Sequence, residues 1–327
     1  MFDKISKEIN NLVTAYSSQD KVIFRNKTLD INQNNFNLVE RAEVVKTVTY
    51  IDGGQAEIVS TGNFCLSFIR IFAAKFCGTE KLDFVKHEFY LLTFAKRSNL
   101  DNDAGVGSSD LTYYSKIFPV TERFNLLDED ELTISSEDSS IKEGWERAPI
   151  AKVANMARRF AELKLAKRLA LQDYSDYFLL DGILEPTFKG EETILTELPG
   201  SVCGLAKSCS LFTAQGNSPV ALFSNLGPLG VWSYFLDGKS YFVKLHENAK
   251  HIFRFEGDVG VLPHLLANSE DALFLGYPYG LIFADKMARV SNVEKDSLRM
   301  KFLLDKKNEG LLKYLSSSNA HEILDSL

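Results

Sequence analysis

The sequence feature that most constrains the fold is a pair of hydrophobic strand patterns, each of which ends in an aspartate. Residues 158–185 read RRFAELKLAKRLALQDYSDYFLLDGILE, the pattern of a helix that runs into a buried strand ending at Asp181. Far upstream, residues 44–54 read VVKTVTYIDGG, again a hydrophobic strand, ending at Asp52 and Gly53. Two strands that each carry an aspartate to their C-terminal edge suggest one shared site in an α/β fold.

A helix before the second strand carries a third acidic residue, Glu162. Pro149 suits the first turn of this helix, which we expect to run to about Leu171. Small residues in the first half of its apolar stripe let this helix lie close against a sheet. The stripe consists of Ile150, Ala154, Ala157, Ala161, Leu165 and Leu169. Glu162 is expected at the border of the buried face. The alternative is an exposed helical pair with Arg158 or Arg159, worth a few tenths of a kcal/mol.

The rest of the chain predicts one domain over residues 1–327, with a mixed sheet flanked by helices. After Asp52 the chain is expected to turn back twice, giving a meander of three antiparallel strands over 44–51, 56–60 and 64–76. Other expected elements are a helix at 2–17 in the lead-in 1–40, a strand at 87–97, a strand at 201–212, a hairpin at 231–255 and a helix at 276–291. We expect a core over 44–291, a surface insertion over about 99–144 with an acidic excursion at 128–144, and C-terminal helices over 292–327.

The composition is typical of a globular protein and limits the kinds of partner that it can bind. Of 327 residues, 45% are hydrophobic and 25% charged, which is enough for a sizeable core. The net charge of −7 argues against a surface that attracts nucleic acid over its whole extent. No apolar run is long enough for a membrane span and the N-terminal residues lack a signal-peptide core, so we expect a cytoplasmic protein. The four cysteines match no zinc pattern and are expected to be buried thiols.

Four carboxylates from different elements have the character of a site for two metal ions. Two-metal hydrolysis of a phosphodiester needs hard oxygen ligands that hold Mg²⁺ or Mn²⁺, with one ion activating water and the other supporting the leaving oxygen. Asp52, Glu162, Asp181 and Asp285 form such a set. A strand aspartate, a helix glutamate, a second strand aspartate and a late helix acid is the order found in ribonuclease-H-like nucleases.

The ordered motifs resemble those of the NurA nuclease family. They cover most of residues 44–291: YIDGG, ANMARRFAEL, FLLDGIL, GLAKS, YFVKL with HIFRFEG, and GYPYGLIFADKMA. The resemblance implies a ribonuclease-H-like fold and a Mn²⁺-dependent (or Mg²⁺-dependent) nuclease of DNA ends. It implies a 5′ to 3′ exonuclease and single-strand endonuclease, acting as a homodimer with a HerA-type hexameric translocase.

Carried over residue by residue, the resemblance makes Asp52, Glu162 and Asp181 metal ligands. The fourth position falls on Asp285, where some members of the family carry histidine. For Asp181 the alternative role is a helix N-cap.

Further residues are candidates for contacts with DNA. Lys207 is expected either beside the scissile phosphate or at a solvent-facing strand edge. Tyr277 and Tyr279 are candidates for stacking on bases, although an aromatic and proline turn more often packs down ahead of a helix. Arg158 is a candidate for a phosphate contact. Arg254 is a candidate either for a phosphate contact or for cross-strand pairing with Glu256 or a neighbour.

Two other functions fit parts of the pattern. A catalytically silent relative would grip DNA beside a translocase and lose metal binding, which the presence of all three core carboxylates argues against. An actin-like ATPase also places Asp-Gly units at strand ends, but it needs a glycine-rich phosphate turn, and residues 181–186 read DGILEP instead.

Overall fold

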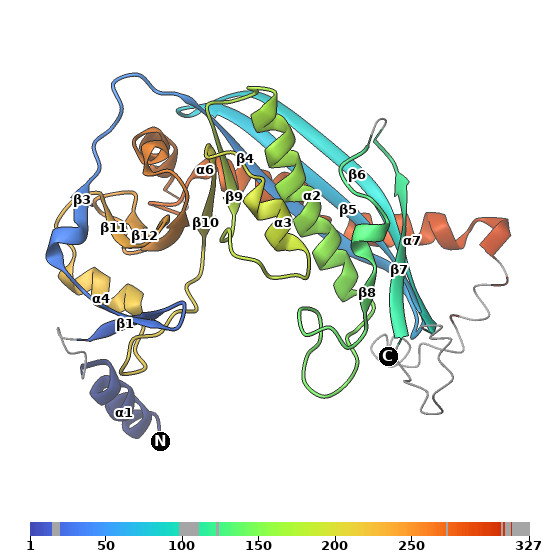
Figure 1. The fold of residues 1–327 in the computed structure, drawn as a ribbon, viewed down its shortest axis with the longest axis horizontal. Helices are drawn as coiled ribbons and strands as arrows, with labels where there is room; N and C mark the ends of the chain where they lie inside the picture. Colours follow the sequence, from blue (N-terminus) through green and yellow to red (C-terminus); the bar gives the residue numbers. More distant parts are fainter. Residues whose placement is uncertain are drawn as a thin grey trace.

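A mixed sheet of eleven strands forms the body of the molecule (Figure 1). The computed structural model describes residues 1–14, 20–97, 111–121, 124–272 and 274–308, together with residues 310 and 315. The strand order in the sheet is β3-β11-β12-β13-β10-β9-β4-β5-β6-β7-β8. The mixed sheet flanked by helices that the sequence predicts is therefore confirmed.

Three parallel strands form the centre of the sheet. They are β4 (Thr47–Ser60), β9 (Tyr177–Asp181) and β10 (Val202–Ala206). β9, β10 and the part of β4 that pairs with β9 are mainly apolar, because both faces of a central parallel sheet are covered. β9 is short and pairs with β4 only at the start of the longer strand.

An antiparallel meander extends the sheet on one side of β4. It consists of β5 (Phe64–Cys77), β6 (Glu80–Arg97), β7 (Leu111–Pro119) and the short β8 (Ile134–Ser135). The expectation that the chain turns back after Asp52 is wrong. β4 continues through Gly53 and Gly54 to Ser60, because it pairs with β5 along this length apart from a register shift between Glu57 and Val59.

The other side of the sheet is built from C-terminal strands. The predicted hairpin is confirmed as β11 (Trp232–Asp237) and β12 (Ser240–Lys244), followed by β13 (Phe253–Glu256) beside β10. β3 (Phe36–Leu38) closes this edge, while β1 (Lys21–Phe24) and β2 (Lys27–Asp30) form a separate two-stranded sheet.

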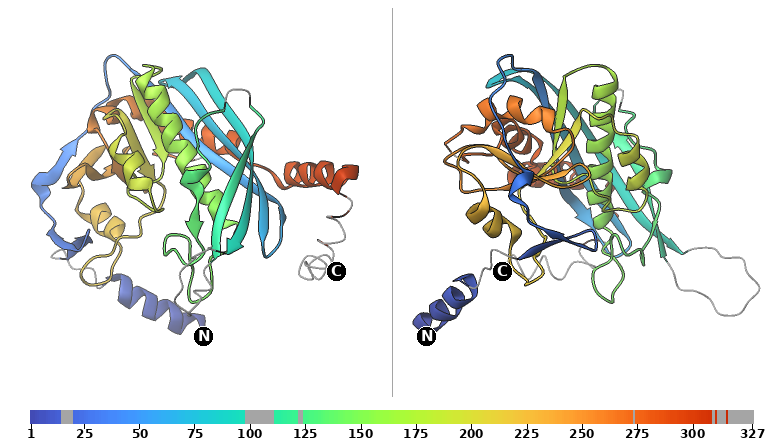
Figure 2. Two further views of the ribbon diagram at one scale, coloured as in Figure 1. Left: turned by 45° about the vertical axis from the view of Figure 1, so that its right-hand side comes forward. Right: turned by 60° about the vertical axis from the view of Figure 1, so that its left-hand side comes forward.

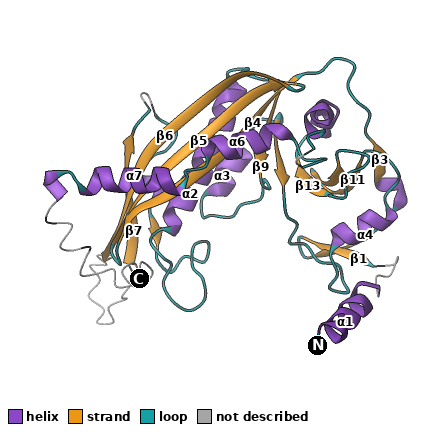
Figure 3. Cartoon of the chain, turned by 180° about the vertical axis from the view of Figure 1, so that it is seen from behind, coloured by secondary structure: helices purple, strands orange, loops and turns teal. Residues whose placement is uncertain are grey.

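Helices cover both faces of the sheet. On one face lie α2 (Lys152–Leu171) and α3 (Glu191–Thr196), as Figure 2 shows. On the other lies α6 (Tyr279–Ala288), followed by α7 (Asn292–Leu303), as the view from behind in Figure 3 shows. The remaining helices are α1 (Phe2–Thr14), α4 (Pro219–Leu226) and the single turn α5 (Leu262–Leu265).

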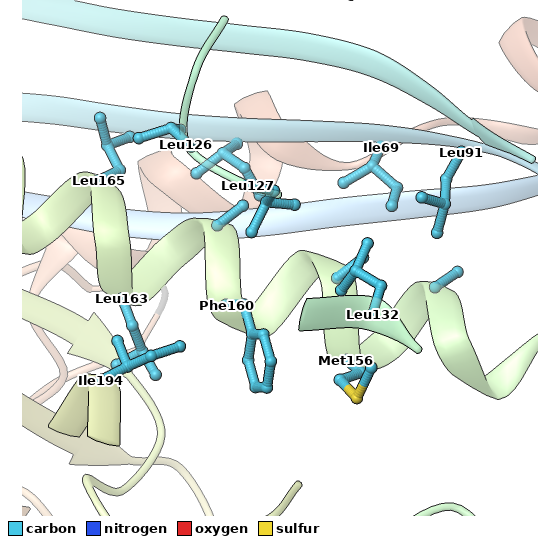
Figure 4. Packing of buried hydrophobic residues seen from close by; sticks show 14 of the residues in the cluster. Ile69, Leu91, Leu126, Leu127, Leu132, Met156, Phe160, Leu163, Leu165 and Ile194 are labelled. Carbon is cyan, nitrogen blue, oxygen red and sulfur yellow. The ribbon is translucent and has the colours of Figure 1, made fainter. Parts of the chain in front are cut away.

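The apolar stripe of α2 packs into the largest hydrophobic cluster. Figure 4 shows Phe160 and Leu165 of this helix among side chains from the sheet and from the segment after β7. The acidic stretch at 128–144 belongs partly to this core. Its Leu132 and Ile134 are buried, so it is more firmly packed than the expected surface excursion, although its acidic residues face outward. The first part of the expected insertion, residues 99–110, lies outside the described residues.

α6 approaches the sheet closely because two glycines stand at its contacts. A Cβ atom on Gly280 would lie 2.5 Å from Cγ of Tyr50 and closer still to two further ring carbons. A Cβ atom on Gly54 would lie 2.7 Å from the carbonyl carbon of Ala288. The absence of both side chains therefore lets α6 lie directly on β4.

None of the helices in the described ranges has the length and apolarity that crossing a lipid bilayer requires. The four cysteines are free thiols, with Cys65 and Cys203 buried and Cys77 and Cys209 partly buried.

Replacing Gly280 with alanine tests the close approach of α6. The added methyl group would overlap the Tyr50 ring, so we expect Gly280→Ala to lower the free energy of unfolding by about 1–3 kcal/mol. Urea denaturation measures the effect. Gly62→Ala is the matched control, because a Cβ atom there meets no atom within 4 Å. Equal stabilities of the two variants would contradict the packing described above.

Candidate active site

The site lies where two parallel strands separate. β4 and β9 pair from Val48 with Tyr177 to Ile51 with Leu180, and the next residue on each strand is an aspartate, Asp52 or Asp181. Both aspartates follow the alternation of Tyr50 and Leu179, which face α6. Asp181 ends β9 as expected, whereas Asp52 stands in the middle of β4. The parallel pairing alone therefore brings the two acids to one level of the sheet.

Asp52 is a buried acid that carries unfavourable charge interactions. Its side chain is 7% exposed, and its Oδ1 accepts a hydrogen bond of 2.7 Å from the backbone N–H of Gly53. Burial raises the pKa of Asp52 to about 8, helped by the negative charges of Glu162 and Asp181, against a smaller opposing effect of Lys207. Without an additional cation, Asp52 is therefore largely protonated at neutral pH.

Glu162 reaches this site from α2 on the opposite face of the sheet. A Cβ atom on Gly53 would lie 2.8 Å from Cγ of Arg158 and closer still to Oε1 of Glu162. The missing side chain of Gly53 thus leaves the space in which the carboxylate lies. Glu162 is buried rather than at the border of the buried face, and burial raises its pKa, although the charges of Arg158 and Arg159 oppose that rise.

Arg158 is part of the acidic site. Its guanidinium forms an ion pair with Glu162 and donates a hydrogen bond of 3.3 Å to the carbonyl of Gly53. The negative charge of Glu162 raises the pKa of Arg158 most, and Asp52 and Asp181 add to that rise. The helical pair anticipated as an alternative is real, but it is buried on the Glu162 side, and its guanidinium is engaged in the site.

Asp181 is held by two side chains. Lys207, directly after β10, places its Nζ 2.6 Å from Oδ2, and Tyr277 donates a hydrogen bond of 3.2 Å to Oδ1. Burial favours a lower pKa for Lys207, but the hydrogen bond and charge of Asp181 outweigh it and raise that pKa. Lys207 is therefore a partner of the acidic site and not an edge lysine pointing to solvent. The helix-cap alternative for Asp181 does not hold, since α3 begins only at Glu191.

Asp285 lies at the outer side of the site. It is on α6, one helical turn before Arg289, with which it forms an ion pair of 2.8 Å. Its charge still raises the pKa values of Lys207 and Tyr277, so it acts on the same group of side chains. We call Asp52, Glu162, Asp181 and Asp285 the acidic cluster.

For three candidates for contacts with DNA, the structure agrees with the alternative of packing or pairing within the protein. Tyr277 is 1% exposed, so its ring offers no face to a base. Tyr279 makes an edge contact with the Phe76 ring at the border of the hydrophobic cluster that contains Tyr277. Arg254 is buried and forms ion pairs of 2.6 Å with both Glu185 and Glu256.

The donor set fits a hard divalent cation in chemistry and charge. Carboxylate oxygens are the ligands that Mg²⁺ and Mn²⁺ prefer, and the raised pKa of Asp52 reflects in part the mutual repulsion that a cation would relieve. The described side chains do not, however, form a complete set of metal ligands. Within the described ranges, no three histidine, cysteine, aspartate or glutamate side chains are placed so that they can hold a metal ion. Arg158 and Lys207 instead occupy oxygens of Glu162 and Asp181.

The roles of Gly53 and Tyr277 were not predicted from the sequence. The signal for the first was present, because two consecutive glycines within a buried strand indicate close approach by other groups. The hydrogen bond from Tyr277 to Asp181 had no local signal, since 96 residues separate the two side chains.

The raised pKa of Asp52 predicts how stability depends on pH. Between its ordinary value near 3.8 and about 8, the folded protein keeps a proton that the unfolded chain has released, so stability falls as pH rises through this window. Asp52→Asn keeps an acceptor for Gly53 and removes the titration. In EDTA, we expect the parent to lose at least about 1 kcal/mol more than this variant between about pH 5 and pH 8. Parallel urea denaturation curves would contradict the assignment.

Comparisons with known proteins give a likeness in fold. No model of a known protein family matches the chain, and no curated protein matches it in sequence. The solved structure of the NurA nuclease from Sulfolobus solfataricus is similar, with a TM-score of 0.51 and 13% identity over 95% of each chain.

Endonuclease V from Ciona intestinalis, in complex with inosine-containing DNA, gives a TM-score of 0.39 and 12% identity, covering 76% of this chain and 90% of that one. The catalytic domain of human Endonuclease V gives 0.38 and 12%, covering 82% and 92%. TM-scores below 0.5 do not establish a shared fold with Endonuclease V. The chain has a fold similar to that of the NurA nuclease, as the resemblance in sequence implied.

Proposed function

We propose that this protein is a metal-dependent DNA nuclease that hydrolyses phosphodiester bonds. The observation that carries the proposal is the convergence of Asp52, Glu162 and Asp181 from β4, α2 and β9 at the point where the two strands separate. Asp285 and Lys207 border the same point. The likeness in fold to a nuclease of known structure supports this reading.

Asp52, Glu162 and Asp181 would hold a divalent ion, Mn²⁺ or Mg²⁺, and Asp285 would complete the negative surroundings for a second. When bound, such ions lower the pKa of water and stabilise the charge that develops on phosphate oxygens. The protein's own residues would do the positioning. Tyr277 fixes the orientation of Asp181, and the ammonium of Lys207 is free to donate to a phosphate oxygen when it leaves Asp181.

We further propose the finer activities that the NurA resemblance implies. These are 5′ to 3′ exonuclease and single-strand endonuclease action in DNA end processing and repair, by a cytoplasmic homodimer working with a HerA-type translocase. Light scattering tests the dimer and a pull-down with the translocase tests the partner. A monomer that fails to retain any such translocase would remove both proposals without affecting the nuclease proposal.

One observation favours a second candidate, a catalytically silent DNA-binding partner. Arg158 and Lys207 pair with two of the carboxylates, and such internal compensation is also what a site that never takes up metal would show. Cleavage assays separate the two candidates.

Loss of an acidic ligand should abolish cleavage. Replacing even an indirect metal partner costs about 10–100-fold in metal affinity or activity, so we expect Asp181→Ala to lose more than about 100-fold. The assay follows end-labelled single-stranded and duplex DNA in Mn²⁺, Mg²⁺ or EDTA. Asp30→Asn is the control, because Asp30 is an exposed aspartate on β2, in the separate two-stranded sheet. Equal cleavage by the parent and Asp181→Ala would refute the site, and no cleavage in any metal would favour the silent partner.

Gly53→Ala should impair the same activity without removing any functional group. The added methyl group would displace the Glu162 carboxylate and crowd Ile71, whose Cδ1 would lie 2.8 Å away. We expect roughly a 10–100-fold loss of cleavage, as for other changes that misplace a ligand, with the circular dichroism spectrum retained. Gly200→Ala, where a Cβ atom meets nothing within 4 Å, is the control. Full activity of Gly53→Ala would show that the position of Glu162 is unimportant.

A further inference from the structure

The acidic cluster already contains two cations of its own. When all four carboxylates are ionised, as metal binding requires, the guanidinium of Arg158 and the ammonium of Lys207 leave two net negative charges. Arg289, the partner of Asp285, is 71% exposed, so solvent screens most of its contribution. Arg159 also acts on Glu162, but its charge is compensated by an ion pair with Glu191. One divalent ion is therefore enough to neutralise the cluster.

Arg158 is fixed where a cation would be needed. Its guanidinium joins two points, the Glu162 carboxylate and the carbonyl of Gly53, and Gly53 is the neighbour of Asp52 in the chain. A planar guanidinium held by two acceptors has a defined position, unlike an ammonium held by one. Lys207, in contrast, contacts only Asp181 within the cluster, and its side chain is 43% exposed.

The position of Arg158 limits what Glu162 can bind. One oxygen of this buried carboxylate is occupied by the guanidinium, and burial keeps water from screening a second cation brought to the same place.

We propose that Arg158 takes the place of a second divalent ion, so that the protein without nucleic acid holds one metal ion per chain and not two. The inference rests on the proposed metal-dependent function and refines the expectation of two ions. Arg158 is then a positioning residue that sets the number of metal ions through Glu162.

Titration with Mn²⁺ in the absence of nucleic acid tests the proposal. Isothermal calorimetry gives the number of ions per chain, and electron paramagnetic resonance detects the spin coupling of two neighbouring Mn²⁺ ions. The variants are Arg158→Met, which removes the charge at similar length, and Arg158→Lys, which keeps it. Arg168→Met is the matched control, because it removes a positive charge from the same helix. The Arg168 guanidinium donates a hydrogen bond to the carbonyl of Asn125, outside the acidic cluster.

We expect one ion per chain in the parent, Arg158→Lys and Arg168→Met, and two spin-coupled ions in Arg158→Met. Two ions in the parent would overturn the proposal while leaving the nuclease function intact, and this result does not depend on the folding of any variant. One ion in a folded Arg158→Met would also overturn it. Failure of every protein to bind Mn²⁺ would contradict the metal-dependent function itself, and the inference with it.

Discussion

The parallel pairing of β4 with β9 over four residues is the constraint on which the rest of the site depends. It ends where Asp52 and Asp181 begin, so the geometry of the sheet, and not a loop, sets the distance between the two acids. Everything else is arranged around this point. Gly53 lets α2 bring Glu162 across from one face, while Gly54 and Gly280 let α6 lie close on the other face with Asp285.

Gathering acids in a partly buried place is unfavourable, and the protein offsets this with its own groups. Arg158 and Lys207 supply positive charge and Tyr277 supplies a hydrogen bond, yet the pKa of Asp52 remains raised to about 8. Because burial first and repulsion by Glu162 and Asp181 second keep this pKa raised, the fold tolerates the cluster without being stabilised by it. Retaining such a cluster is typical of functional sites, because a structural core gains more from apolar residues.

Much of the fold follows from local sequence signals, whereas the supporting contacts of the site do not. The apolar run of β9 and the helical spacing of apolar residues in α2 identify both elements, and the sequence also predicts the aspartate at the end of β9. The continuation of β4 past Gly53 is not, because Asp-Gly is also a common turn and only the pairing with β5 decides between them. For Arg254 and Tyr277 the sequence leaves two roles open, because their burial arises from tertiary packing that no local pattern encodes.

The most direct test of the central claim is a crystal structure of the protein with Mn²⁺, using anomalous scattering to locate the ion. The account predicts a peak in contact with carboxylate oxygens of Asp52 and Asp181, with Arg158 still on Glu162. An ion bound elsewhere, or no ion at the point where β4 and β9 separate at saturating Mn²⁺, would contradict it.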